Sequence, residues 1–118
     1  MNQILNQVDW QKERFWEEVE GDQELAQELL KRFLSSAQHL LEEIEASLAR
    51  GDLDTAKEKA HSLKGAAGII HCEGLRREAL ALEKTSSLEE AASHLSHLRE
   101  LYQRFVRLLQ AQQPGLAN

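Results

Sequence analysis

Four residues in the middle of the chain have the types and spacing of a chemical site. Steps of three and four residues place on one stripe of a helix the residues His61, Lys64, Gly65 and Gly68. Each glycine in a helix interior costs about 0.8–1 kcal/mol relative to alanine, so the two together cost roughly 2 kcal/mol without a local benefit. We infer that another molecule must come close to the histidine on this side. His61 is then a surface nucleophile, kept bare on one flank so that a partner protein can dock over it.

The same helix carries a second stripe, which indicates how the helix packs in the fold. Its neighbouring stripe is apolar and faces a core: Leu53, Ala56, Ala60, Leu63, Ala67 and Ile70. If the chain folds back about residue 72, Glu83 is as far from that turn as His61 and lies opposite it. A carboxylate there accepts a hydrogen bond from one imidazole nitrogen and leaves the other nitrogen free as a nucleophile or ligand. Lys64 neutralises charge on a group attached to His61, which is worth on the order of 1 kcal/mol at an exposed site.

The remaining chain predicts further helices. Asp9 is expected to cap a first helix that ends near Val19, and Asp22 a long second helix that ends at the Gly51–Asp52 turn. The second helix has a widened apolar seam: Leu25, Leu29, Phe33, Ala37, Leu40, Ile44 and Leu48, with Leu30, Leu34 and Leu41 beside it.

The third helix spans residues 53–70, and a fourth follows Gly74 with an apolar seam of Leu75, Ala79 and Leu82. A capping box of Ser86 with Glu89, or of Ser87 with Glu90, begins the last helix. Short turns between amphipathic helices force antiparallel neighbours. We therefore predict an all-α fold, an up-down-up-down four-helix bundle with a short N-terminal capping helix. The bundle takes residues 9–110, after a loose lead-in of residues 1–8 and before a disordered tail of residues 111–118.

Composition excludes several classes of function. The net charge of −6 argues against a nucleic-acid binder, which needs a basic footprint. The single cysteine, Cys72, cannot form an internal disulfide and indicates a reducing compartment. No signal peptide and no apolar stretch long enough to span a bilayer is present, so we expect a cytoplasmic protein without a membrane segment.

A family resemblance rests on residues 61–68, which read His-Ser-Leu-Lys-Gly-Ala-Ala-Gly. This run resembles the core motif of the histidine-containing phosphotransfer (HPt) domains of bacterial and plant two-component phosphorelays. The similarity covers roughly residues 9–110 and includes residues 22–33 and the Leu82-Glu83 pair. It implies a four-helix bundle whose exposed His61 takes a phosphoryl group from an aspartate of one receiver domain and passes it to another.

The resemblance also implies roles for the neighbours of His61. Lys64 would be the phosphate neighbour, Gly65 the opening for the receiver, and Glu83 would stand where the family often has a glutamine. The expected docking surface consists of residues around His61 on the second and third helices: Gly65, Gly68, Leu34, Gln38 and Leu41. The sequence departs from the family at His71, where a glycine is usual, and at Ile69, where an asparagine is frequent. The departure at position 71 bears on the turn after the third helix.

The implied partners are response-regulator receiver domains and a hybrid sensor kinase. The receiver would supply magnesium and an acidic pocket, so the chain is expected to be a monomeric phosphoryl carrier rather than an enzyme, without a cofactor. Gly65 and Gly68 do not fit the spacing of a nucleotide-binding loop. Phosphoryl transfer depends mostly on positioning and charge stabilisation, so the few residues around His61 are sufficient for it.

Other interpretations remain open at this point. The bundle could be an adaptor that binds a receiver without carrying phosphate. His94 and His97, at a spacing of three, could form a metal site with Cys72 or His71, but three or four ligands would have to converge, so we expect no metal. Taken singly, Lys64 and Glu83 are ordinary surface charges. The two glycines would equally allow close packing between helices.

Overall fold

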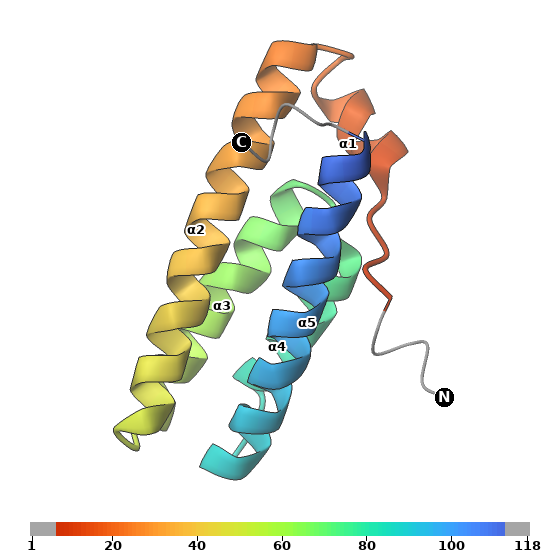
Figure 1. Cartoon of the computed structure of the whole chain (residues 1–118). Coiled ribbons are helices and arrows are strands. Elements are labelled where there is room, and N and C mark those ends of the chain that lie inside the picture. Colours follow the sequence, from red (N-terminus) through yellow and green to blue (C-terminus); the bar gives the residue numbers. More distant parts are fainter. Residues whose placement is uncertain (1–6, 113–118) are drawn as a thin grey trace.

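The computed structural model describes residues 7–112 and contains five helices within that range. They are α1 (Lys12–Glu18), α2 (Gln23–Ala49), α3 (Leu53–Ile69), α4 (Glu73–Glu83) and α5 (Leu88–Gln112). Figure 1 shows α2 to α5 side by side, with α1 at the end of the bundle where α2 begins. The predicted all-α fold, an up-down-up-down four-helix bundle with a short capping helix, is confirmed. Residues 1–6 of the expected lead-in and residues 113–118 of the expected tail lie outside the described residues, whereas Ala111 and Gln112, also predicted in the tail, belong to α5.

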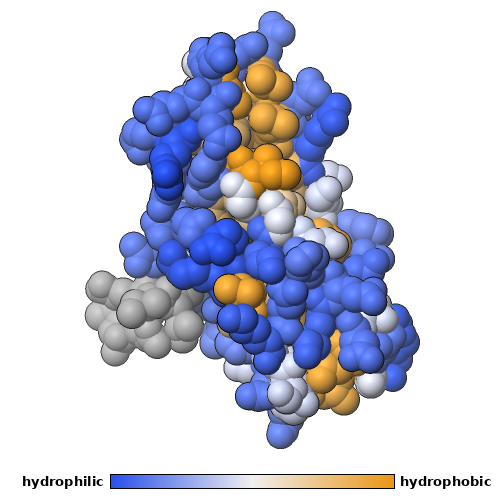
Figure 2. Space-filling view, turned by 180° about the vertical axis from the view of Figure 1, so that it is seen from behind, coloured by the Kyte–Doolittle hydropathy of each residue, from blue (hydrophilic) through white to orange (hydrophobic). Residues whose placement is uncertain are grey.

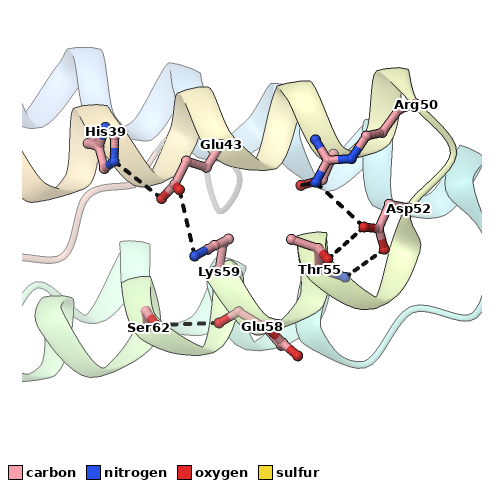
Figure 3. Close-up of polar contacts among 9 residues, drawn as sticks. His39, Glu43, Arg50, Asp52, Thr55, Glu58, Lys59 and Ser62 are labelled. Atoms are coloured by element: carbon pink, nitrogen blue, oxygen red, sulfur yellow. Dashed lines mark hydrogen bonds and ion pairs between the residues drawn. The ribbon is translucent and has the colours of Figure 1, made fainter.

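Local capping residues set most of the helix boundaries. Asp22 accepts a hydrogen bond from the backbone N–H of Leu25 at 3.1 Å and so begins α2 as expected. Gly51 has a φ of +77°, the left-handed conformation that ends α2, and Asp52 caps α3 through the N–H of Thr55 at 3.0 Å (Figure 3). The hydroxyl and backbone hydrogen bonds from Thr55 hold the pKa of the Asp52 carboxyl below its usual value. The tight α2–α3 turn sets these two helices antiparallel.

The same local chemistry begins the last helix. The backbone N–H of Glu90 donates to the Ser87 hydroxyl at 3.1 Å, and the Glu90 carboxylate accepts from the backbone N–H of Ser86 at 3.2 Å. The Ser87–Glu90 box is therefore the one that forms.

The first helix begins later than predicted. Asp9 has a φ of +51° and does not cap α1, which starts after Gln11. The Asp9 carboxylate instead accepts a hydrogen bond from Arg77 of α4 at 3.0 Å, a partner 68 residues away that local propensity cannot reveal. The α1 helix is nevertheless anchored, because Phe15 is buried at 1% exposure and the ring of Trp10 lies edge-on to that of Phe105 with centroids 5.3 Å apart.

The core-facing seam of α3 is as predicted, whereas that of α2 is rotated. On α3 the buried residues are Ala56, Ala60, Leu63 and Ala67. On α2 they are Ala26, Leu30, Phe33, Ala37, Leu41, Ile44 and Ser47. Leu25, the first residue of the predicted α2 seam, is 42% exposed, and Leu29 and Leu40 are only partly buried. The three alanines on α3 let this helix approach its neighbours closely. The opposite stripe of α3 faces outward.

A segment before α1 fastens the turn between α3 and α4. The Val8 carbonyl accepts from the N–H of Gly74 at 2.9 Å, so the end of the predicted loose lead-in is tied down. Trp10 Nε1 donates to the carbonyl of Ile70 at 2.8 Å. A Cβ on Gly74 would lie closer than 3.0 Å to the Val8 carbonyl oxygen, so only glycine fits beneath this segment.

His71, the departure from the HPt-like pattern predicted to bear on the turn after the third helix, ends α3 with a left-handed backbone conformation. Its φ is +62°, and the N–H groups of His71 and Cys72 donate to Gly68 and Ala67, the pairing of a Schellman motif. Its ring pairs with the carboxylate of Glu18 on α1. The turn after α3 is therefore a regular helix C-terminus, formed at the cost of a left-handed conformation in a residue with a side chain.

None of the helices within residues 7–112 has the length and apolar character needed to cross a bilayer.

Candidate functional site

His61 stands on the outward stripe of α3. Its side chain is 64% exposed, whereas Ala60 and Leu63 beside it are completely buried. The buried seam fixes the rotation of the helix, and this rotation directs position 61 away from the core. The imidazole is thus held on a rigid element and is accessible to a large partner.

Glu83, the last residue of α4, connects the two functional side chains predicted on α3. Its Oε2 lies 2.8 Å from Nδ1 of His61, and its Oε1 lies 2.8 Å from the ammonium nitrogen of Lys64. The predicted contact between Glu83 and His61 is present. Lys64 is 25% exposed and, in this structure, turns to Glu83.

The charge on Glu83 determines which imidazole nitrogen is free. Hydrogen bonds from Lys64 and then from His61 hold the pKa of the Glu83 carboxyl below its usual value, so it is ionised at neutral pH. An ionised carboxylate can only accept hydrogen bonds, so the proton of the pair sits on Nδ1 of His61. Within residues 7–112 no side chain or backbone group hydrogen-bonds to Nε2 of His61. In the neutral ring its lone pair is therefore available to an incoming electrophile.

Neither helical glycine of the motif is required by packing within the described part of the chain. A Cβ at Gly65 would meet nothing within 4 Å, and Gly65 is exposed. A Cβ at Gly68 would lie 3.8 Å from Cδ of Arg76, an ordinary van der Waals contact. The helix-propensity cost of about 2 kcal/mol is thus not offset by closer packing inside the fold. The helix-packing interpretation of Gly65 is therefore not supported within the described residues.

The three docking candidates predicted on α2 do not lie beside His61. Leu41 is 1% exposed and belongs to the core, so that prediction is wrong. Gln38 lines a hollow with Tyr102 and Gln103 of α5, and the Leu34 carbonyl accepts from the Tyr102 hydroxyl at 2.9 Å. The apolar pattern of α2 covers more than one side of that helix, and it does not say which side borders α3.

The side of α2 that does border α3 carries an apolar groove that the sequence analysis missed. This groove has a volume of about 200 Å³ and is lined by Leu29, Arg32, Phe33, Ser36, Ala66, Ile69 and Ile70. Ile69 is 65% exposed, an unusual exposure for an isoleucine. It follows His61 and Gly65 at steps of four, a signal in the sequence that could have found it. Figure 2 shows hydrophobic surface gathered in a band toward one end of a largely hydrophilic face.

A second hollow lies on the other side of His61. It has a volume of about 390 Å³ and is lined by Asp54, Lys57, Glu58, His61 and Glu83. The imidazole therefore stands between a polar hollow, at the α4 side, and the flank that leads past Gly65 to the apolar groove.

The structure does not bring Cys72 or His71 to His94 and His97. Cys72 is completely buried beside the Val8 carbonyl, and burial raises the pKa of its thiol to about 12. His71 pairs with Glu18 instead. The metal site considered from the sequence, with these two residues as ligands, does not form in the described part of the chain.

The fold and site define a class of protein: a helical bundle that presents an exposed histidine on α3, hydrogen-bonded through Nδ1 to a carboxylate of α4. Comparison with known families assigns the class. The model of the Hpt domain family matches residues 28–108, more than half of the chain. The chain belongs to the Hpt domain family, as its motif predicted.

A curated relative agrees with this assignment. The chain is 31% identical over 93 residues to the phosphorelay intermediate protein rdeA of Dictyostelium discoideum. The match covers 76% of this chain and 37% of that protein, so the chain spans little more than a third of the relative's length. No solved structure matches the chain significantly.

Membership of the family supports a phosphotransfer role in two-component signalling.

Proposed function

We propose that His61 accepts a phosphoryl group on Nε2 from the aspartyl phosphate of one receiver domain and passes it to an aspartate of a second receiver. The observation that carries this proposal is the 2.8 Å contact between Nδ1 of His61 and Glu83, which occupies one ring nitrogen of a side chain that is 64% exposed and leaves the other nitrogen available.

The proposed step exchanges one bond to phosphorus for another. The Nε2 lone pair attacks phosphorus, the P–O bond to the receiver aspartate breaks, and its electron pair leaves with the carboxylate. The ring keeps its proton on Nδ1 and so becomes positively charged beside the ionised Glu83. Glu83 therefore stabilises the phosphorylated state more than the free state, which favours loading. The second receiver reverses these bond changes.

Magnesium and an acidic pocket come from the receiver in this proposal, because transfer of a phosphoryl group needs positioning and charge neutralisation. Lys64 supplies a local cation. Its ammonium group is 2.8 Å from Glu83 in the free chain, and its flexible side chain can turn to the phosphoryl oxygens once these arrive. We place its contribution on the order of 1 kcal/mol, as for other partly exposed ion pairs.

The receiver docks, in our proposal, over the α3 stripe of His61, Gly65 and Ile69 and into the apolar groove beside it. Because Gly65 has no side chain, the receiver can approach the helix closely. Gly68 likewise leaves the same surface without a side chain toward α4. Ile69 and Leu29 supply apolar area. The donor receiver belongs to a hybrid sensor kinase, and the chain acts as a monomer so that one face serves two receivers in turn.

Radiolabel transfer tests the acceptor. A receiver carrying labelled aspartyl phosphate should give acid-labile label to the wild type and none to His61→Gln. His39→Gln is the matched control, since His39 is also exposed on a helix, at 71%, and should leave labelling unchanged. Label that persists in His61→Gln refutes the assignment. A wild type that binds the receiver but takes no label is an adaptor instead.

Two charge substitutions test the docking surface. Ile69→Asp should slow transfer about tenfold or more, because a charge then enters an apolar contact. Gln38→Asp is the matched control on the α5 side of α2 and should transfer at the wild-type rate. Both positions are exposed, so neither change should unfold the chain. Equal rates for the two variants would place the docking surface elsewhere.

A further inference from the structure

A cluster of three potential metal ligands lies between α4 and α5, formed by residues that the phosphotransfer site does not use. Glu78 comes from α4, and His94 and His97 come from successive turns of α5. Their ligand atoms all lie within 4.8 Å of one another. The sequence showed only the histidine pair, because Glu78 reaches it through the packing of two helices.

The positions of the three atoms are close to what a zinc ion requires. Nδ1 of His94 hydrogen-bonds to Oε2 of Glu78, and Nδ1 of His97 lies 3.5 Å from the same oxygen. Ligand atoms around a tetrahedral zinc ion stand about 3.3 Å apart, as follows from zinc–ligand bonds of about 2.0–2.1 Å. Small side-chain rotations would therefore bring all three atoms onto one ion.

The second observation is an unsatisfied nitrogen. Nδ1 of His97 is buried and makes no hydrogen bond within the described residues. Such an atom costs free energy unless something binds it. The side chain of Glu78 beside it is only 13% exposed, so its carboxylate lies next to this nitrogen at a largely covered position.

We infer that Glu78, His94 and His97 form a zinc-binding site, with a water molecule as the fourth ligand. Two imidazoles and one carboxylate suit a borderline cation such as Zn²⁺ and do not suit Mg²⁺ or Ca²⁺, which prefer oxygen ligands. The ion would link α4 to α5, and α4 is the helix that ends with Glu83. Imidazole and carboxylate ligands bind a metal ion in their deprotonated forms, so zinc affinity falls as the pH is lowered.

Calorimetry and thermal unfolding with Zn²⁺ test this site. The wild type should bind one Zn²⁺ per chain, and at a hundredfold excess over the Kd its Tm should rise by about 10 °C. Mg²⁺ should not raise it. His97→Gln should weaken zinc binding about tenfold or more. This variant is the most informative, because His97 Nδ1 has no hydrogen bond to lose and the fold should survive the change.

Two controls keep the result specific. His39→Gln should bind zinc as the wild type does, since His39 pairs with Glu43 on the separate helix α2. His61→Gln should also bind zinc normally. The inference is overturned if the wild type binds no zinc, if His97→Gln binds it equally well, or if binding is lost in His61→Gln, which would assign the ion to the phosphotransfer site. Phosphoryl labelling of His61 is independent of each of these outcomes.

Discussion

Replacing Gly65 by alanine should separate stability from function. The added Cβ meets nothing within 4 Å, so the substitution removes only the helix-propensity cost of glycine. We expect the free energy of unfolding to rise by about 0.8–1 kcal/mol and the Tm by about 3–6 °C. Transfer from a receiver should nevertheless slow. An extra methyl group in a closely packed contact costs about 1–3 kcal/mol, which corresponds to roughly 5- to 150-fold in rate.

Urea unfolding and the rate of label transfer at low receiver concentration measure the two effects on the same preparation. Ser93→Ala is the matched control: Ser93 is exposed on α5, so this change should also stabilise the chain by a few tenths of a kcal/mol and leave transfer unchanged. A Gly65→Ala variant that is more stable and transfers at the wild-type rate would refute the docking role of Gly65. A less stable variant would refute the open space around it.

Three further changes have outcomes that follow from the structure. Gly74→Ala should lower the free energy of unfolding by about 1–3 kcal/mol in urea, because its Cβ would displace the Val8 carbonyl. His71→Gly should raise the free energy of unfolding by about 0.5–1 kcal/mol, and so raise the Tm slightly, since glycine accepts a φ of +62° without strain. The stability advantage of wild type over Glu83→Gln in urea unfolding should be present at pH 7 and should be lost as the pH falls below 4.5 and through the lowered pKa of Glu83, because protonation removes its ion pair.

Local chemistry explains why most of the fold could be predicted from the sequence. Asp22, Asp52 and Ser87 cap helices through hydrogen bonds to residues three positions away, and Gly51 ends α2 by its own backbone freedom. Asp9 failed as a predicted cap because its partner, Arg77, is distant in sequence. Capping residues are thus reliable where no long-range contact competes for the same side chain.

The same distinction between local and long-range contacts explains which parts of the candidate site could be predicted. The contact between His61 and Glu83 could be predicted because both residues lie eleven positions from residue 72, at the turn between two packed helices. The side of α2 that borders α3 could not be predicted, because the apolar residues of α2 outnumber those that one seam requires. Leu41 proved to be core and Leu29 to line the groove, a distinction that only the packing of α3 and α5 around α2 decides.

Locating the phosphoryl group on the loaded chain tests the central claim most directly. Two-dimensional ¹H–¹⁵N NMR of the imidazole rings, recorded after loading from a phosphorylated receiver, distinguishes the two nitrogens of every histidine. The Glu83 contact with Nδ1 predicts a phosphoryl group on Nε2 of His61, with the proton still on Nδ1. A phosphoryl group on Nδ1 of His61, or on a different histidine such as His39, would contradict the account.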